Sequence, residues 1–441
     1  MKSNWVNMLY KYSFSVATLL VIRSVASMIY GSLLPYIYKP FRDISRDIDW
    51  EFINRGLDGI HGARDTLQWW TGTWCGEVPF WRPLASYVFL LERLLWPQEF
   101  MLPRQIIAVC AHMVFLFLSA ALLWRITYKK WLVITAIWLF AGARPFPISL
   151  LFSGCESVRE ALSDPKNIPD FFSGISIVLS LLLLTYARWG LGLIFAIIGV
   201  CFKEIGFTAW PLAGIMIAWL NREKILTHGG MPFVLACIRK NWLPTLFWLL
   251  ALGSLGLVHW VSVGFGYSLG SNEAWWWRTI TFFGCPLICY FLSHEKAPVV
   301  IVCLAFIFLL LLRRRSLVYK LIGMLVAFTV GVVADAHQLA IPWQVSMTRL
   351  LLPDGALPAI IACGFWLLAA WEARQDWQII TLGLLLAIIS SAPTFFVAQA
   401  LPHTRYVASM FLSMVSAAAL CRLAYHLAHL GGTLAFGKPK R

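Results

Sequence analysis

Charged residues are scarce in this chain. Asp, Glu, Lys and Arg make up 13% of its 441 residues, whereas apolar residues make up 60% and the mean hydropathy is +0.73. Soluble domains are about 25% charged and disordered segments are poor in apolar residues, so both classes are excluded. The apolar runs are continuous rather than alternating, which also excludes an outer-membrane barrel. An all-α polytopic membrane protein is the class that remains.

Patterns typical of metal sites are also missing. The ten cysteines include no Cys-x-x-Cys pair and no Cys/His spacing of a zinc site. Acidic residues are few, with 21 Asp and Glu against 36 Lys and Arg, for a formal net charge of +15. Because cytoplasmic loops of membrane proteins collect Lys and Arg, we attribute this excess to topology and expect no nucleic-acid partner.

The hydropathy pattern predicts one transmembrane domain over residues 1–441. A spanning helix needs about 20 apolar residues, which leaves room for about 11 spans. Lys2 and Lys11 precede the first span and place the N-terminus in the cytoplasm. A large outer loop is then expected over 39–104. The predicted spans are 12–38, 105–124, 131–152, 171–186, 242–267, 298–312, 317–333, 356–371, 377–393 and 406–427; whether 279–292 crosses or re-enters the membrane is left open.

Two short apolar runs, 189–202 and 205–220, flank Lys203 and Glu204. One long helix through both runs would place the two charges near the bilayer centre, at a cost of about 2.5–3.5 kcal/mol each. We therefore expect a tight helical pair whose tip, at Lys203 and Glu204, faces the outer side.

Two short motifs in the outer loop could carry chemistry. Ile48-Asp49-Trp50 follows the first span, and Phe80-Trp81-Arg82-Pro83-Leu84 precedes an amphipathic helix. A carboxylate beside a tryptophan at the membrane boundary can act where the dielectric constant is low. An arginine held by a following proline presents a planar fork suited to phosphate.

The order of these motifs resembles multi-spanning glycosyltransferases of the GT-C class, which take sugars from polyprenyl-phosphate carriers. Bacterial membrane glycosyltransferases, and O-mannosyltransferases with tetratricopeptide tails, show an acidic pair after span one, Tyr-Arg-Pro-Leu, Lys-Glu in a middle span and a late Arg-Tyr. The matching positions here are Asp49 with Asp47, Trp81-Arg82-Pro83-Leu84, Lys203-Glu204 and Arg405-Tyr406. The acidic pair is split by Ile48, and the sequence contains no tetratricopeptide repeats.

This resemblance implies an inverting hexosyl- or pentosyltransferase of a bacterial inner membrane, active on the outer face. Asp49, with Asp47 in reserve, would be the general base, because a leaving lipid phosphate needs no general acid. The expected substrate-binding residues are Trp81, Arg82, Lys203, Glu204, Arg405 and Tyr406. The donor would be a polyprenyl-phosphate sugar, and the acceptor a glycan, lipid or protein.

No cofactor is required by this chemistry, although a divalent metal ion bound by Asp49 with Glu77 or Glu156 stays open. Two other functions also remain open, a lipid-linked glycan ligase or polymerase and a transporter or flippase. The main outer loop follows the first span, which favours the transferase over the ligase. The absence of an inverted repeat disfavours the transporter.

Overall fold

The computed structural model describes residues 2–41, 48–72, 81–141, 158, 161–227, 239, 241–263, 376–395 and 406–436. The chain divides into two compact units. Unit 1 comprises Met1–Gly142, Gly154–Ser271 and Gln378–Val415, and unit 2 comprises Ala143–Ser153, Asn272–Trp377 and Ser416–Arg441. The contacts that concern the candidate site all lie in unit 1.

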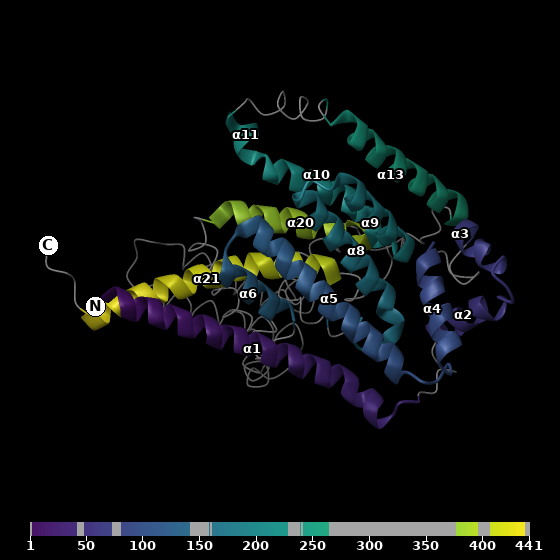
Figure 1. Cartoon of the computed structure of the whole chain (residues 1–441), viewed down its shortest axis with the longest axis horizontal. Coiled ribbons are helices and arrows are strands. Elements are labelled where there is room, and N and C mark those ends of the chain that lie inside the picture. The colour runs from purple at the N-terminus through teal and green to yellow at the C-terminus, as the bar shows by residue number, and fades with distance from the viewer. Residues whose placement is uncertain are drawn as a thin grey trace, which may run out of the picture. The chain divides into compact units, whose positions relative to one another are not determined.

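The described residues are helical and contain no strand; an isolated bridge joins Phe41 and Phe100. Figure 1 labels the main helices. The α-helices are α1 (Lys2–Tyr38), α2 (Ile48–Asp58), α3 (Gln68–Thr71), α4 (Pro83–Leu95), α5 (Leu102–Thr127), α6 (Lys130–Phe140), α8 (Ile168–Thr185), α9 (Trp189–Phe202), α10 (Ala209–Leu220), α11 (Arg222–Thr227), α13 (Trp242–Val263), α20 (Trp377–Phe395) and α21 (Tyr406–Phe436). Short 3-10 helices are η1 (Asp65–Leu67), η3 (Pro165–Asn167) and η4 (Glu204–Thr208).

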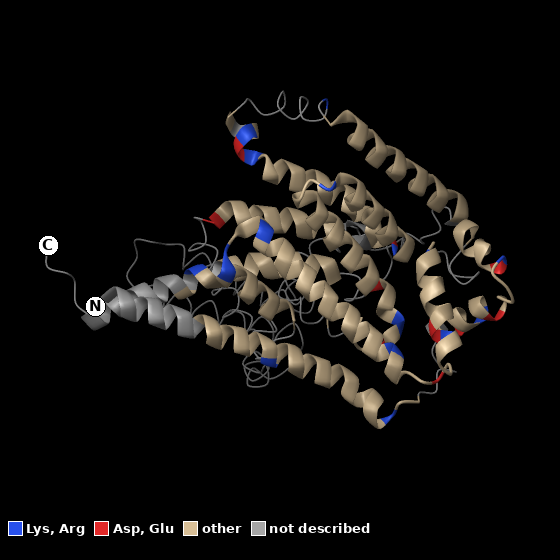
Figure 2. Cartoon of the chain, viewed as in Figure 1, with Lys and Arg blue, Asp and Glu red and all other residues tan. Residues whose placement is uncertain are grey.

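Among the described residues, four helical segments are long and apolar enough to cross a membrane, so the chain is a helical membrane protein. They are Phe14–Tyr38, Leu102–Thr127, Pro165–Thr185 and Trp242–Ser262. Long stretches of α5, α8 and α13 carry no charged residue (Figure 2). These four agree with predicted spans. The predicted span 131–152 is described as a helix only over Lys130–Phe140, and the predicted segments 279–292, 298–312, 317–333 and 356–371 lie outside the described residues.

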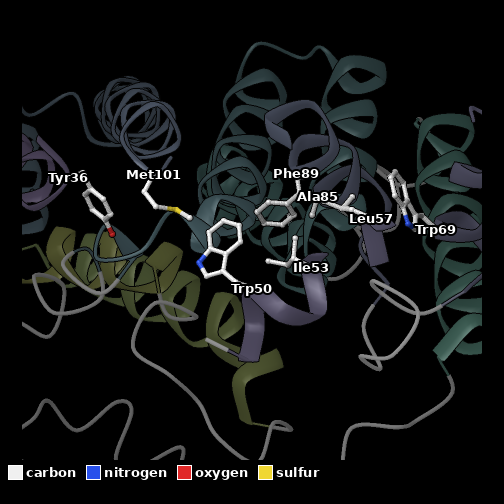
Figure 3. Close-up of a cluster of buried hydrophobic side chains, with 8 residues drawn as sticks. All are labelled: Tyr36, Trp50, Ile53, Leu57, Trp69, Ala85, Phe89 and Met101. Atoms are coloured by element: carbon white, nitrogen blue, oxygen red, sulfur yellow. The ribbon is translucent and has the colours of Figure 1, made fainter. Parts of the chain in front are cut away.

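The loop after the first span contains a folded core of its own. Trp50 of α2 lies edge-on to Phe89 of α4, with ring centroids 6.0 Å apart, and Ile53 and Leu57 pack in the same cluster (Figure 3). The apolar positions of α2 and α4 recur at helical spacing, which gives each helix one face to bury. Because α4 begins at Pro83, this packing fixes the position of the preceding Arg82.

The chain reverses direction between α9 and α10, as the sequence predicts. Lys203 has an extended backbone (φ −162°, ψ 149°) and ends α9. A Cβ atom added to Gly206 would lie 2.2 Å from the backbone carbon of Gly199, so η4 folds directly back onto the last turns of α9. Only glycine permits such a close backbone approach. We call α9, η4 and α10 the tip hairpin, with Lys203 and Glu204 at its turn.

Several helix ends of unit 1 meet on one side. The Tyr36 hydroxyl, near the end of α1, donates to the Ser163 carbonyl at 2.8 Å, and the Gln105 amide in the first turn of α5 donates to the Leu162 carbonyl at 2.7 Å. The tip hairpin packs against α8 and α4. The end of α1, the starts of α5 and α8 and the turn of the hairpin are therefore neighbours.

Candidate active site

Arg82 and Glu204 form a two-pronged ion pair across 122 residues of sequence. The Arg82 Nε atom donates to both Glu204 carboxylate oxygens at 3.1 Å, and Nη2 donates to Oε2 at 2.9 Å. Both side chains are about one-tenth exposed, at 11% and 13%. A guanidinium held through two nitrogens is fixed in direction as well as in position.

Lys203 and Asp170 form a second ion pair beside the first. The Lys203 ammonium donates to Asp170 Oδ1 at 2.6 Å, and both side chains are buried. Asp170 lies in the first turn of α8, where the partial positive charge of the helix N-terminus favours a carboxylate. We call Arg82, Asp170, Lys203 and Glu204 the tip cluster.

The tip cluster contains two cations and two carboxylates, and the charges of Arg82, Asp170 and Glu204 all act on Lys203. Burial lowers the pKa of the Lys203 ammonium; the charge of Arg82 acts in the same direction, whereas Asp170 and Glu204 oppose it. The formal charges of the four side chains cancel. This balance lets two cations remain in a poorly hydrated place, where an uncompensated charge would be very costly.

Tyr406, at the start of α21, lies near the tip cluster. The Asp170 carboxylate acts electrostatically on its hydroxyl, and its ring contacts Phe171 edge-on at 5.1 Å. The hydroxyl shares a hydrogen bond with His112 Nδ1 in the middle of α5. Tyr406 and His112 are both fully buried, which makes this pair a polar contact inside the bundle.

Trp81 precedes the tip cluster and is almost fully buried. Its indole N–H donates to the Trp70 carbonyl at 3.0 Å, and the two rings meet edge-on at 6.2 Å. These contacts give Trp81 a packing role that holds the chain just before Arg82. Its contact with a substrate stays a prediction.

The predicted base lies on α2, which packs against α4, the helix that begins directly after Arg82. Asp49 is in the first turn of α2, where the structure describes its backbone and not its side chain, while Asp47 and Arg405 lie outside the described residues. The structure therefore brings together Arg82, Lys203 and Glu204, with Tyr406 nearby. The roles of all these residues stay predictions.

A further buried ionisable pair, outside the tip cluster, lies on α4 and α5. Glu92 and Arg104 are both almost fully buried, yet the closest approach, from Arg104 Nε to Glu92 Oε2, is 3.9 Å. Neither Glu92 oxygen has a hydrogen-bond partner within the part of the chain that the structure describes. Burial raises the pKa of Glu92 to about 7, and the charge of Arg104 only partly opposes this. The Arg104 guanidinium lies 5.2 Å from the ring centre of Trp50, the residue that follows Asp49 in the sequence.

A metal centre finds no support among the described residues, which contain no group of three His, Cys, Asp or Glu side chains able to hold an ion. The suggested ligands Glu77 and Glu156 lie outside those residues, as does the side chain of Asp49. A metal-bound form of the site therefore stays a prediction.

Sequence reasoning missed Asp170, His112 and the pair of Glu92 with Arg104. A signal existed for His112, because an ionisable residue inside an apolar run is unusual in a membrane helix. Asp170 gave no comparable signal, since an acid at the start of a helix is common. Comparison of the chain with protein-family models, curated proteins and solved structures found no match.

Proposed function

We propose that the protein is a membrane glycosyltransferase that moves a sugar from a polyprenyl-phosphate carrier to an acceptor at the outer face of a bacterial inner membrane. In this proposal the helices form a GT-C-like bundle of about 11 spans. The observation that carries it is the tip cluster. Arg82 and Lys203-Glu204, which belong to separate motifs of the resemblance, contact one another in a buried site, and Tyr406 lies beside it.

The position of the tip cluster suits a lipid-linked donor. It lies at the turn of the tip hairpin and at the first turn of α8, where several apolar helices end. A polyprenyl chain occupies the hydrocarbon region, and its phosphate lies at the membrane boundary. Cations at the ends of apolar helices would therefore lie at the depth of such a phosphate.

The chemistry requires a base and cations. An acceptor oxygen attacks the anomeric carbon, the bond from that carbon to the phosphate oxygen breaks, and its electron pair leaves with the lipid phosphate. Arg82 and Lys203 would stabilise the negative charge of the departing phosphate. Asp49, or Asp47, would accept the acceptor's proton.

The packing of the outer loop supports this division of roles. Asp49 directly precedes Trp50, which packs on Phe89 of α4, and α4 starts immediately after Arg82. The helix that carries the proposed base is thus attached to the helix that positions a proposed phosphate ligand. Glu204 and Asp170 would orient the two cations before the donor binds, so less order is lost on binding.

The test uses purified full-length protein in lipid nanodiscs with a panel of synthetic polyprenyl-phosphate sugars. Release of polyprenyl phosphate is measured by mass spectrometry. We expect turnover with at least one donor, a loss of about 10²–10⁴-fold in Asp49→Asn, and a large loss in Arg82→Gln. Arg55→Gln is the matched control, because Arg55 forms an exposed pair with Glu51 on α2 and should keep normal turnover.

Three results would count against the proposal. The first is no cleavage of any donor by protein that is folded. The second is full activity in both Asp49→Asn and Asp47→Asn, which would remove the base from this loop. The third is movement of the intact donor lipid across the membrane without cleavage, which would favour a flippase.

A further inference from the structure

Two basic turns lie side by side at the ends of α5 and α8 that are remote from the tip cluster. The first, residues 124–130, joins α5 to α6, and the second, residues 185–190, joins α8 to α9. The guanidinium carbon of Arg125 lies 5.1 Å from the ring centre of Tyr186, so the two turns are in contact. Neither turn takes part in the proposed transfer reaction.

Positive charge is concentrated on these turns. The first contains Arg125, Lys129 and Lys130, the second contains Arg188, and neither segment contains Asp or Glu. Lys129, Lys130 and Arg188 are exposed. Basic residues gathered on two segments that contain no acid attract an anionic group.

Both turns have an unusual backbone that shapes the surface. Tyr128 (φ 52°) and Ala187 (φ 57°) are the non-glycine residues with positive φ among those the structure describes. This conformation is unfavourable for an L-residue and persists only where surrounding contacts impose it. Here Arg125 Nη1 donates to the Tyr128 hydroxyl at 2.7 Å and lies against the faces of Tyr128 and Tyr186.

An exposed apolar stripe on α5 leads into the basic turns. Val114, Phe117 and Trp124 recur on one face of the helix and are 48%, 74% and 39% exposed. Tyr128 continues the same face and is exposed beside Lys129. A ligand that fits this surface has an apolar chain along α5 and an anionic group at the turns.

We propose that these two turns form a binding site for a membrane phospholipid with a net negative headgroup. The lipid phosphate would contact Arg125, Lys130 and Arg188, and the Tyr128 and Tyr186 rings would lie at the headgroup level. An acyl chain would lie on the stripe of Val114, Phe117 and Trp124. A soluble phosphate would not use this stripe, which is why the site is assigned to a lipid.

Native mass spectrometry of the full-length protein, taken from nanodiscs of mixed phosphatidylglycerol and phosphatidylcholine, tests this site. The wild type should retain phosphatidylglycerol in preference to phosphatidylcholine. Lys130→Gln/Arg188→Gln, which changes two exposed side chains, should bind phosphatidylglycerol about thirtyfold more weakly, because each basic residue near an anionic surface contributes a factor of about five to six in affinity. Adding Arg125→Gln should weaken binding further.

The control is Arg222→Gln/Lys224→Gln on α11. Arg222 also lies over an aromatic ring, that of Trp219 at 4.3 Å, but Glu223 separates it from Lys224. This variant should retain phosphatidylglycerol as the wild type does. Equal retention of both lipids by the wild type, or an equal loss in the control, would overturn the proposal. Displacement of the lipid by inorganic phosphate alone would assign the site to a soluble anion instead.

Discussion

In the tip cluster each cation lies within 3.1 Å of a carboxylate oxygen, whereas Arg104 approaches Glu92 only to 3.9 Å. Both sites are buried, and both use side chains from separate helices. In the tip cluster the short contacts compensate the loss of hydration, so the groups can remain charged. Glu92 lacks that compensation and its pKa rises to about 7. Burial alone therefore does not determine the charge state; the distance to the opposite charge does.

The largest effect is expected from removing one member of the Lys203 pair. Lys203→Met leaves the Asp170 carboxylate buried without its cation. Asp170→Asn leaves the Lys203 ammonium buried without its carboxylate. Each single variant should lose about 3–5 kcal/mol of unfolding free energy. The double variant should recover much of this loss, because no buried charge is left uncompensated. Denaturant unfolding in detergent measures all four proteins, and simple addition of the two losses would show that the pair is not coupled.

Glu92 should make stability depend on pH. Its pKa is about 7 in the folded protein against 4.5 when unfolded. Well below pH 4.5 the Glu92 carboxyl is protonated in both the folded and the unfolded state, so its ionisation does not lower the free energy of unfolding. As the pH rises towards 7, only the unfolded state ionises, so stability falls, by about 3 kcal/mol at most (2.5 pH units at about 1.4 kcal/mol each).

The measurement compares Glu92→Gln with the wild type at pH 5 and pH 8, so that other titrating groups cancel. The difference in unfolding free energy should be larger at pH 8, in favour of the glutamine variant. Glu51→Gln, at an exposed position of α2, is the control and should show no such change between the two pH values. A constant difference for Glu92→Gln would mean that Glu92 is already ionised at pH 5.

A smaller loss is expected from Arg82→Lys. Lysine keeps the positive charge but cannot donate through two fixed nitrogens to Glu204, and it should cost about 1–2 kcal/mol. Arg82→Gln should cost more, because it leaves the Glu204 carboxylate without its counter-charge. Thermal unfolding of both variants checks the order. Equal stability of the lysine variant and the wild type would show that charge alone, and not the two-pronged geometry, holds the tip cluster together.

The smallest effect is expected at the exposed pair of Arg93 and Asp58, whose atoms are 2.6 Å apart. The Arg93 and Asp58 side chains are 30% and 62% exposed, so water and salt screen their attraction. Arg93→Gln should lose no more than about 1 kcal/mol. Any loss should shrink further in high salt, whereas the loss in Lys203→Met should not. A large loss that resists salt would make exposure a poor guide to the strength of these pairs.

The sequence predicted the features that depend on local pattern. The positions of α1, α5, α8 and α13 follow from the length of their apolar runs, and the tip hairpin follows from the cost of burying Lys203 and Glu204 in mid-membrane. The partners of the charges were not predictable in the same way. Arg82 finds Glu204 and Lys203 finds Asp170 only through helix packing, which no local pattern encodes.

The Glu92 side chain illustrates the same limit on α4. The amphipathic pattern of α4 correctly predicts a helix with one buried face. It does not predict that a glutamate on this helix is buried near Arg104, because the position of α5 decides which side of α4 is covered. For the same reason, the motifs of the resemblance include Lys203 but cannot supply its partner Asp170, which lies outside all of them.

The extended backbone at Lys203 directs two consecutive side chains to different partners. Lys203 reaches Asp170 at the start of α8, while Glu204 reaches Arg82 at the start of α4. One peptide unit thus ties α8, a helix long enough to span the membrane, to α4 in the loop after the first span. Because Gly206 lies directly against Gly199, this unit has little room to shift by itself. Any movement of Arg82 must therefore either break its contact with Glu204 or be transmitted to α8, which makes the turn a mechanical link between the loop and the bundle.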